Sequence, residues 1–300
     1  MRAKPFSNDG GNAMAAFRVD DIRISSVLES EAPVFGIREL IPDLDDAILA
    51  EEAPRLAPRW IDAKAGKLVT TFQSYVIETP QRTILVDTGI GNDKTGRRRA
   101  YYNNAAWPFL ENLRAAGYTP EDIDIVVLTH IHVDHVGWNT RLVDGRWVAT
   151  FPKARYVVVG EELKDAEAKA KTEPQRYAAL WADSLVPIIE AGAVDMVPPD
   201  HAIDPAVRLG PSPGHTANHV SVWIGHDAPR AVITGDVLHH PVQARHPELN
   251  SQACALGAIA RTTRHMLLEQ CAAEDILAMP IHFDPCRVRP AGKVWEFAPP

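Results

Sequence analysis

Cysteine is scarce in this sequence. The 300 residues include three cysteines, Cys254, Cys271 and Cys286. Because the number is odd and no pair has CxxC spacing, a disulfide framework is excluded, and buried apolar thiols are the simplest interpretation. A protein without disulfides suits the reducing cytoplasm, which is the localisation that we expect.

Long apolar runs and an excess of positive charge are also absent. No apolar run approaches the roughly 20 residues that a membrane span requires, and no apolar stretch follows Arg2 and Lys4 as in a secretory signal. The formal net charge is −8, which disfavours nucleic acid or an anionic membrane surface as a partner. The run Arg97-Arg98-Arg99 is a local exception, and a solvated loop is its simplest interpretation.

The composition fits an ordinary soluble protein, and the organisation of the sequence indicates one domain. Hydrophobic residues make up 46% of the chain, as in ordinary soluble proteins. No linker or repeat divides the sequence, so we predict a flexible polar leader at residues 1–16 and a single domain over residues 17–300. Two segments, near residues 32–60 and 91–107, look like insertions, and loops of this length often form lids or binding loops.

Strand and helix patterns alternate along the domain. Strands are expected at residues 17–28, 68–78, 83–86, 123–128, 156–159, 220–224, 231–234 and 276–280. Helices are expected at residues 108–116, 161–171 and 252–273. The apolar run at 123–128 (IDIVVL) is typical of a strand that is buried on both faces.

Four potential metal ligands follow that buried strand directly. The segment Thr129-His130-Ile131-His132-Val133-Asp134-His135 holds three histidines and one aspartate. Imidazole nitrogen and carboxylate oxygen both bind zinc at about 2.0–2.2 Å. His130 and His132 are two residues apart and can face one ion, whereas Asp134 and His135 can reach a second one. A lone loop histidine is ordinarily a surface residue, but this spacing after a buried strand favours metal binding.

Further potential ligands follow apolar strands or sharp turns in the second half of the chain. His215 lies in the turn Pro213-Gly214-His215-Thr216, Asp236 follows the expected strand at 231–234, and His282 follows the one at 276–280. Each would be a weak signal alone, since Gly-Asp and Pro-Gly-His are common in turns. Because all three residues lie at strand ends, they are stronger candidates for metal ligands together than each is alone.

These motifs resemble the metallo-β-lactamase superfamily over roughly residues 68–282. The resemblance implies a four-layer αββα sandwich of the α/β (α+β) class with two divalent metal ions, zinc first and iron, manganese or cobalt as alternatives. The implied ligands are His130, His132 and His215 for the first metal, Asp134, His135 and His282 for the second, and Asp236 as the bridge. Asp87, in the Asp-Thr-Gly turn after residues 83–86, is implied to orient a ligand histidine.

The two-metal pattern predicts a hydrolase in which a metal-bridging hydroxide attacks an ester-like bond. Asp134 can take up a proton during the attack. Residues 134–139 and 212–216 resemble the branch with quorum-quenching lactonases and methyl parathion hydrolase-type esterases, which implies a lactone or carboxylic ester of a small molecule as substrate. A phosphotriester or phosphodiester is the alternative on the same site. An iron-dependent oxidoreductase of the same fold is the alternative from another class.

The sequence departs from the lactonases three residues after the bridging position. Those lactonases have a tyrosine there that helps to hold the lactone, whereas this chain has His239. An imidazole can donate a hydrogen bond to a developing oxyanion or protonate a leaving alkoxide, and a structural role is equally compatible. We therefore treat His239 as a candidate catalytic residue beside Asp134.

Substrate-facing residues are predicted from the aromatic side chains near the insertions. Phe35, Trp60, Trp107, Trp138 and the pair Tyr101-Tyr102 lie in or beside the inserted segments or the metal motif, and pockets for small molecules are mostly apolar. The leader and the 32–60 segment carry apolar residues in polar surroundings, which makes a homodimer contact through them a hypothesis.

Overall fold

Two β-sheets form the centre of this computed structural model, which describes residues 15–300. Of the predicted leader, residues 1–14 lie outside the described residues, and Ala16 already begins a strand. The first sheet has the strand order β1-β2-β4-β5-β6-β9-β10, with β3 paired to β4. Its strands are β1 (Ala16–Val19), β2 (Ile22–Gly36), β3 (Ile61–Asp62), β4 (Lys67–Glu78), β5 (Thr83–Val86), β6 (Ile125–Val127), β9 (Arg155–Val159) and β10 (Val194–Val197).

The second sheet is built from the last third of the chain, in the order β11-β12-β13-β14-β15-β16-β17. Its strands are β11 (Ala202–Asp204), β12 (Val207–Pro211), β13 (Val220–Ile224), β14 (Ala231–Ile233), β15 (Leu277–Met279), β16 (Cys286–Ala291) and β17 (Val294–Ala298). A separate hairpin consists of β7 (Thr140–Val143) and β8 (Arg146–Ala149).

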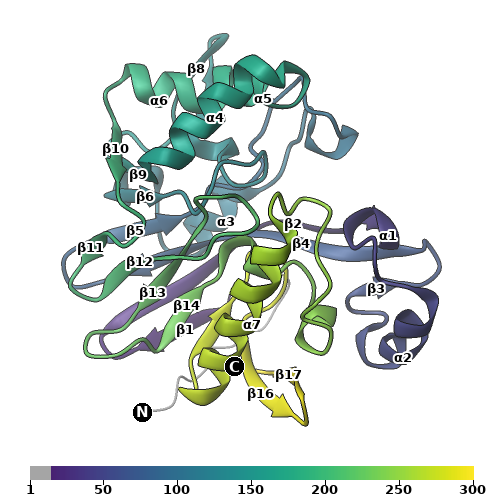
Figure 1. The fold of residues 1–300 in the computed structure, drawn as a ribbon. Helices are drawn as coiled ribbons and strands as arrows, with labels where there is room; N and C mark the ends of the chain where they lie inside the picture. The colour runs from purple at the N-terminus through teal and green to yellow at the C-terminus, as the bar shows by residue number, and fades with distance from the viewer. Residues whose placement is uncertain (1–14) are drawn as a thin grey trace.

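Helices cover the outer faces of both sheets (Figure 1). They are α3 (Phe109–Ala115), α4 (Gly160–Thr172), α5 (Pro174–Leu180) and α6 (Val186–Glu190) on the first sheet and α7 (Gly257–Ala273) on the second. The helices α1 (Ile37–Leu40) and α2 (Asp46–Leu56) lie beside one end of β2 and β4 (Figure 1). One apolar core lies between the sheets and joins Val86 and Val127 to Val222 and Ile233. A second core packs α3 and α4 on the first sheet, and a third packs α7 on the second sheet. This is the predicted αββα sandwich.

Pairs of parallel strands determine where the loops that hold the candidate ligands come together. β5, β6 and β9 are parallel neighbours in the first sheet, and β14 and β15 are parallel in the second. Because the carboxyl ends of parallel strands lie at one edge, the segments after β5 and β6 meet there, as do those after β14 and β15. The apolar run at 123–128 is therefore confirmed as a central buried strand.

The 32–60 segment is not the loop that its composition predicted. β2 continues to Gly36, α1 and α2 follow, and β3 begins at Ile61. The side chain of Asp45 accepts a hydrogen bond from the Ile48 backbone N–H at 2.9 Å, so it caps the start of α2. Residues 91–107 are irregular apart from one short 3-10 turn, as predicted. No helix within residues 15–300 is both long and apolar enough to cross a membrane.

Buried charges fix the 91–107 loop to the body of the protein. Lys94 is fully buried. Its Nζ donates to Thr140 Oγ1 at 2.7 Å and lies 3.6 Å from Asp183 Oδ1 and 3.6 Å from the centre of the Trp147 ring. Burial lowers the pKa of Lys94 to about 7, although the Asp183 carboxylate opposes that shift.

Replacing Lys94 by methionine tests this burial through the pH dependence of stability. Because the folded-state pKa lies below the ordinary 10.5, the unfolded chain binds the proton more tightly, and stability rises with pH between the two values. Wild-type stability relative to Lys94→Met is expected to increase by about 2 kcal/mol between about pH 7 and about pH 9 in urea unfolding. The exposed Lys164→Met is the control, and a difference that stays constant with pH would contradict the described burial.

Candidate metal centre

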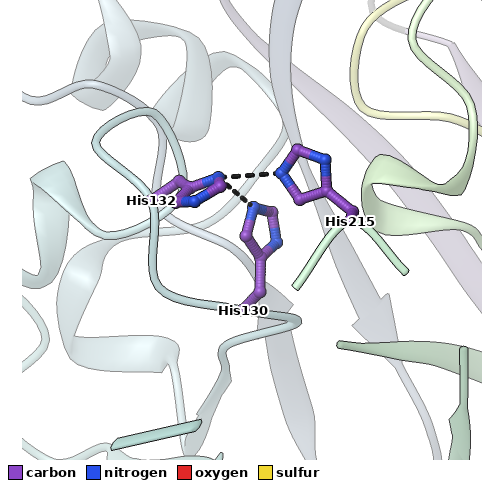
Figure 2. A group of neighbouring side chains, drawn as sticks. All are labelled: His130, His132 and His215. Atoms are coloured by element: carbon purple, nitrogen blue, oxygen red, sulfur yellow. Dashed lines mark hydrogen bonds between the residues drawn. The ribbon is translucent and has the colours of Figure 1, made fainter. Parts of the chain in front are cut away.

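Three imidazoles from two distant parts of the chain point to one place. His130 and His132 follow β6, and His215 lies on the turn between β12 and β13 (Figure 2). His132 Nδ1 lies 3.2 Å from His130 Nε2 and 2.8 Å from His215 Nε2. The structure thus brings together the three residues that were implied as ligands of the first metal.

These three rings are neutral and offer lone pairs. Burial and the neighbouring imidazoles lower the pKa of His130 well below 6.5, and burial likewise lowers the pKa of His215 well below that value and that of His132 to about 3. His130 Nδ1 donates to Thr129 Oγ1 at 3.0 Å, so its Nε2 lone pair faces the other two rings. A divalent cation binds the neutral form of imidazole.

Asp87 holds His135 for a second group of donors. One Asp87 carboxylate oxygen accepts from the Thr129 backbone N–H at 2.8 Å, and the other accepts from Thr129 Oγ1 and from His135 Nδ1, both at 2.8 Å. The proton on Nδ1 leaves the His135 Nε2 lone pair directed into the site. Asp87 has a positive φ of 57°, a backbone conformation that aspartate tolerates better than most residues. This is the orienting contact that the resemblance implied.

The second group of donors contains Asp134, His135 and His282. His282 Nδ1 donates to the backbone oxygen of Thr71 at 3.1 Å, so its Nε2 faces the site. The Asp134 carboxylate lies 3.9 Å from both His135 Nε2 and His282 Nε2. These are the three residues implied for the second metal.

The carboxylate of Asp236 lies between the two groups. Its Oδ1 is 3.0 Å from His282 Nε2 and 3.2 Å from His135 Nε2, whereas its Oδ2 is 3.3 Å from His215 Nε2. Burial raises the pKa of Asp236, but the surrounding imidazoles of His282, His135 and His215 outweigh burial and hold it well below 3.8. Each oxygen of this ionised carboxylate therefore faces a different set of donors.

His219 supports this position and was missed by sequence reasoning. Its Nε2 accepts from the Asp236 backbone N–H at 2.9 Å, and its Nδ1 lies 2.8 Å from Ser212 Oγ. Gly235 has a φ of 52°, and a Cβ there would stand 2.4 Å from His219 Nε2. Glycine is therefore required next to the bridging position. The available signal was a second histidine directly before the apolar strand β13.

Buried atoms without partners test whether cations fit the site. His135 Nε2 and Asp236 Oδ1 are buried and lie 3.2 Å apart, but neither atom forms a hydrogen bond, although buried polar atoms without hydrogen bonds are costly. Burial lowers the pKa of His135, but Asp236, Asp87 and Asp134 together raise it well above 6.5. The same negative potential attracts a cation, and the nitrogen and oxygen donors suit zinc and other divalent metals. The donor set fits two cations with Asp236 between them.

A cavity of about 380 Å³ opens onto these donors. Asp134 and His239, the two candidate catalytic residues, both line it, as does Phe35. His239 Nε2 lies 3.1 Å from His215 Nδ1 and 3.3 Å from Asp236 Oδ2, and its Nδ1 has no partner. His239 thus contacts both a ligand candidate and the cavity, which leaves its catalytic role a prediction.

The three tryptophans predicted to face the substrate do not line this cavity. Trp60 packs its edge on Phe283 with ring centres 6.0 Å apart. Trp107 packs on Tyr101. Trp138 stacks on Phe109, and its Nε1 donates to buried Glu29 at 2.8 Å. Their aromatic surface is used to hold the surrounding loops, so this part of the substrate-pocket prediction is corrected.

Tyr102, Tyr177 and residues 251–253 line the cavity instead. The Arg97-Arg98-Arg99 run also lines it and is not a merely solvated loop. Tyr102 belongs to the Tyr101-Tyr102 pair that the sequence offered as a candidate, whereas no motif distinguished Tyr177 or residues 251–253, because the direction of these side chains depends on packing between distant parts of the chain.

The pattern of the metallo-beta-lactamase superfamily matches residues 73–275 of the chain. Because this is more than half of the sequence, the chain belongs to that superfamily. The family is metal-dependent and typically dinuclear, in agreement with the clusters of histidine and aspartate described above.

Relatives with assigned names include hydrolases and lactonases. A probable metallo-hydrolase of Mycobacterium tuberculosis is 29% identical over an alignment of 183 residues that covers 55% of this chain and 56% of the relative. An N-acyl homoserine lactonase of Bacillus thuringiensis subsp. kurstaki is 25% identical over an alignment of 175 residues that covers 53% of this chain and 60% of the relative. The matched part thus spans little more than half the length of these relatives.

Solved structures share the fold over nearly the whole chain. The hydrolase AbOPH superposes with a TM-score of 0.79 at 21% identity, covering 95% of this chain and 96% of that one. The dizinc quorum-quenching lactonase AidC, in complex with a product, superposes with a TM-score of 0.76 at 18% identity, covering 96% and 97%. At such identities the likeness shows the fold.

The Asp87→Asn variant tests the orienting contact. Asparagine can donate through the atom that now accepts from His135 Nδ1, so the ring loses its preferred tautomer and metal affinity is expected to fall about 10- to 100-fold. Competition with a chelator measures this affinity. Asp204→Asn is a matched control, because buried Asp204 also accepts from a backbone N–H and a threonine hydroxyl, 3.0 Å each, but away from the centre. Equal affinity in both variants would contradict the role given to Asp87.

Proposed function

We propose that the protein is a dinuclear metal-dependent hydrolase that cleaves a lactone or carboxylic ester of a small organic molecule. The observation that carries this proposal is the position of Asp236, whose two oxygens face two separate groups of ligating side chains beside a cavity of small-molecule size. Named relatives that are N-acyl homoserine lactonases support the ester class. His130, His132 and His215 would hold one cation, and Asp134, His135 and His282 the other.

Two bound divalent cations would polarise an ester carbonyl and make a water molecule acidic enough to attack near neutral pH. The protein residues supply the remaining functions. Half-buried Asp134 faces the cavity and can accept the proton that the attacking water gives up. His239 can donate a hydrogen bond to the carbonyl oxygen or a proton to the leaving alkoxide. Phe35, Leu180 and the other apolar lining residues hold the organic part of the substrate and exclude water.

A substrate panel with metal analysis of the same preparation tests this function. We expect about two equivalents of metal per chain, and hydrolysis of lactones or aryl esters that is lost on chelation and restored by zinc. Phosphotriesters and phosphodiesters complete the panel. A preference for phosphorus esters would replace the carbon-ester assignment, and a coloured iron protein that hydrolyses nothing in the panel would refute the hydrolase assignment.

The His239→Gln variant tests the proposed acid. Because general acid catalysis contributes about 10²–10⁴-fold, we expect kcat to fall at least about a hundredfold while metal content stays the same. His240→Gln is the matched control, since His240 is equally buried but bonds to the Trp60 backbone oxygen at 3.0 Å, outside the cavity lining. An unchanged kcat would leave His239 no catalytic role, and a loss of metal would make it a positioning residue for His215.

A further inference from the structure

Two arginines without ion-pair partners line the cavity from opposite parts of the chain. Arg98 belongs to the 91–107 loop and Arg176 to α5, and both side chains are exposed. Among residues 15–300, neither guanidinium forms a hydrogen bond or an ion pair. What distinguishes these two arginines from other exposed arginines such as Arg208 is their place in the cavity lining, where their charge is available to a bound ligand.

The loop around Arg98 is braced on both sides. The Asn103 side chain accepts from the Arg97 backbone N–H at 2.9 Å and donates to the backbone oxygens of Arg97 and Arg99 at 2.7 and 2.6 Å. Arg97 donates to Asp183 Oδ1 at 2.7 Å, and Arg99 pairs with Glu39 and lies over the Phe35 ring. The two neighbours are therefore neutralised and anchored, while Arg98 alone keeps its charge available to the cavity.

Arg176 is linked to the metal centre through one aromatic ring. Its guanidinium carbon lies 5.3 Å from the centre of the Tyr177 ring, and that ring centre lies 6.5 Å from the His132 ring. Tyr177 and His132 both line the cavity. A ligand bound at the metal centre can therefore extend past the Tyr177 ring toward the Arg176 guanidinium.

Apolar and cationic lining together define a kind of ligand. Phe35, Leu40, Val133 and Leu180 provide an apolar wall. Of the acidic residues in the lining, Glu39 is already paired with Arg99, and Asp134 and Asp236 belong to the metal centre. Arginine pairs well with planar or tetrahedral oxyanions. A cavity of about 380 Å³ accommodates a small molecule and not a polymer.

We propose that the cavity selects esters or lactones that carry an anionic oxyacid group (a carboxylate, phosphate or sulfonate) away from the bond that is cleaved, and that Arg98 and Arg176 bind this group. The inference deepens the proposed hydrolase function and rests on it. It assigns to the two arginines a role in substrate specificity that is separate from the metal ligands.

Paired substrates that differ only in charge test the proposal on the metal-loaded protein. One pair is 4-nitrophenyl hydrogen adipate and its methyl ester, whose chain is too long for the free carboxylate to attack its own ester readily, with corresponding phosphate- and sulfonate-bearing esters to distinguish the kind of anion. We expect kcat/KM for the anionic member to exceed that for the neutral one at least about tenfold at low ionic strength, and the ratio to fall as salt is added.

The arginine variants locate the effect. Arg98→Gln and Arg176→Gln are each expected to lower the anionic-to-neutral ratio about three- to tenfold, mainly through KM, and the double variant to bring it near unity. Arg208→Gln is the matched control, since Arg208 is an exposed arginine on β12 outside the cavity lining. The proposal is overturned if the arginine variants leave the anionic-to-neutral ratio unchanged. That result would also be obtained if the anionic group bound the metals and not the arginines.

A further measurement distinguishes failure of the proposed hydrolase function from failure of the proposed anion site. If none of these esters is cleaved, the non-cleavable amide analogues of the same pair are titrated into the metal-loaded protein by calorimetry. Tighter binding of the anionic amide, lost in the double variant, would support the anion site even though the reaction class was wrong. Equal binding of both amides would refute the anion site by itself.

Discussion

The carboxylate of Asp87 connects the ends of two neighbouring parallel strands and, through them, the whole metal centre. Asp87 follows β5, and its oxygens accept from both the backbone and the hydroxyl of Thr129 after β6 as well as from His135. Thr129 in turn accepts from His130. One buried carboxylate therefore sets the protonated nitrogen of a histidine in each group of donors. Because these contacts need parallel strands that end side by side, the β5–β6 pairing of the first sheet is a precondition for the chemistry.

The centre also joins the two sheets. Four of its donors follow β6 in the first sheet, whereas His215, Asp236 and His282 come from turns that follow strands of the second sheet. Burial of several imidazoles and carboxylates with unpaired atoms such as His135 Nε2 opposes folding. Divalent cations that bind only the folded arrangement would offset this cost by mass action. The sandwich and its metal site are consequently coupled, although the apolar core between the sheets extends well beyond the site.

The sequence predicted those features that depend on local pattern. The apolar run of β6 and the spacing of His130, His132 and His135 are properties of a short segment, and the structure has the strand and the cluster there. It did not predict the direction of side chains that depends on distant packing. Trp138 was expected in the pocket, but its indole N–H satisfies buried Glu29, a residue 109 positions away. The run Arg97-Arg98-Arg99 was interpreted as a solvated loop, because nothing local shows that Asp183 pairs with buried Arg97 and that Glu39 pairs with Arg99.

The candidate metal ligands and the wall of the cavity lie on different parts of the fold. The candidate ligands lie directly after the ends of strands in the two packed sheets, where backbone hydrogen bonds and the core determine their directions. The cavity wall is built from the end of β2 and α1, the 91–107 loop, α5 and the segment 251–253. Loops tolerate substitution and insertion far better than packed strands do. Proteins that share this fold at 17–29% identity are therefore expected to differ most in the cavity wall. The substrate of this chain has to be inferred from its own Phe35, Arg98 and Tyr177, which is why these residues carry the proposal of a small molecule with an apolar body and an anionic end.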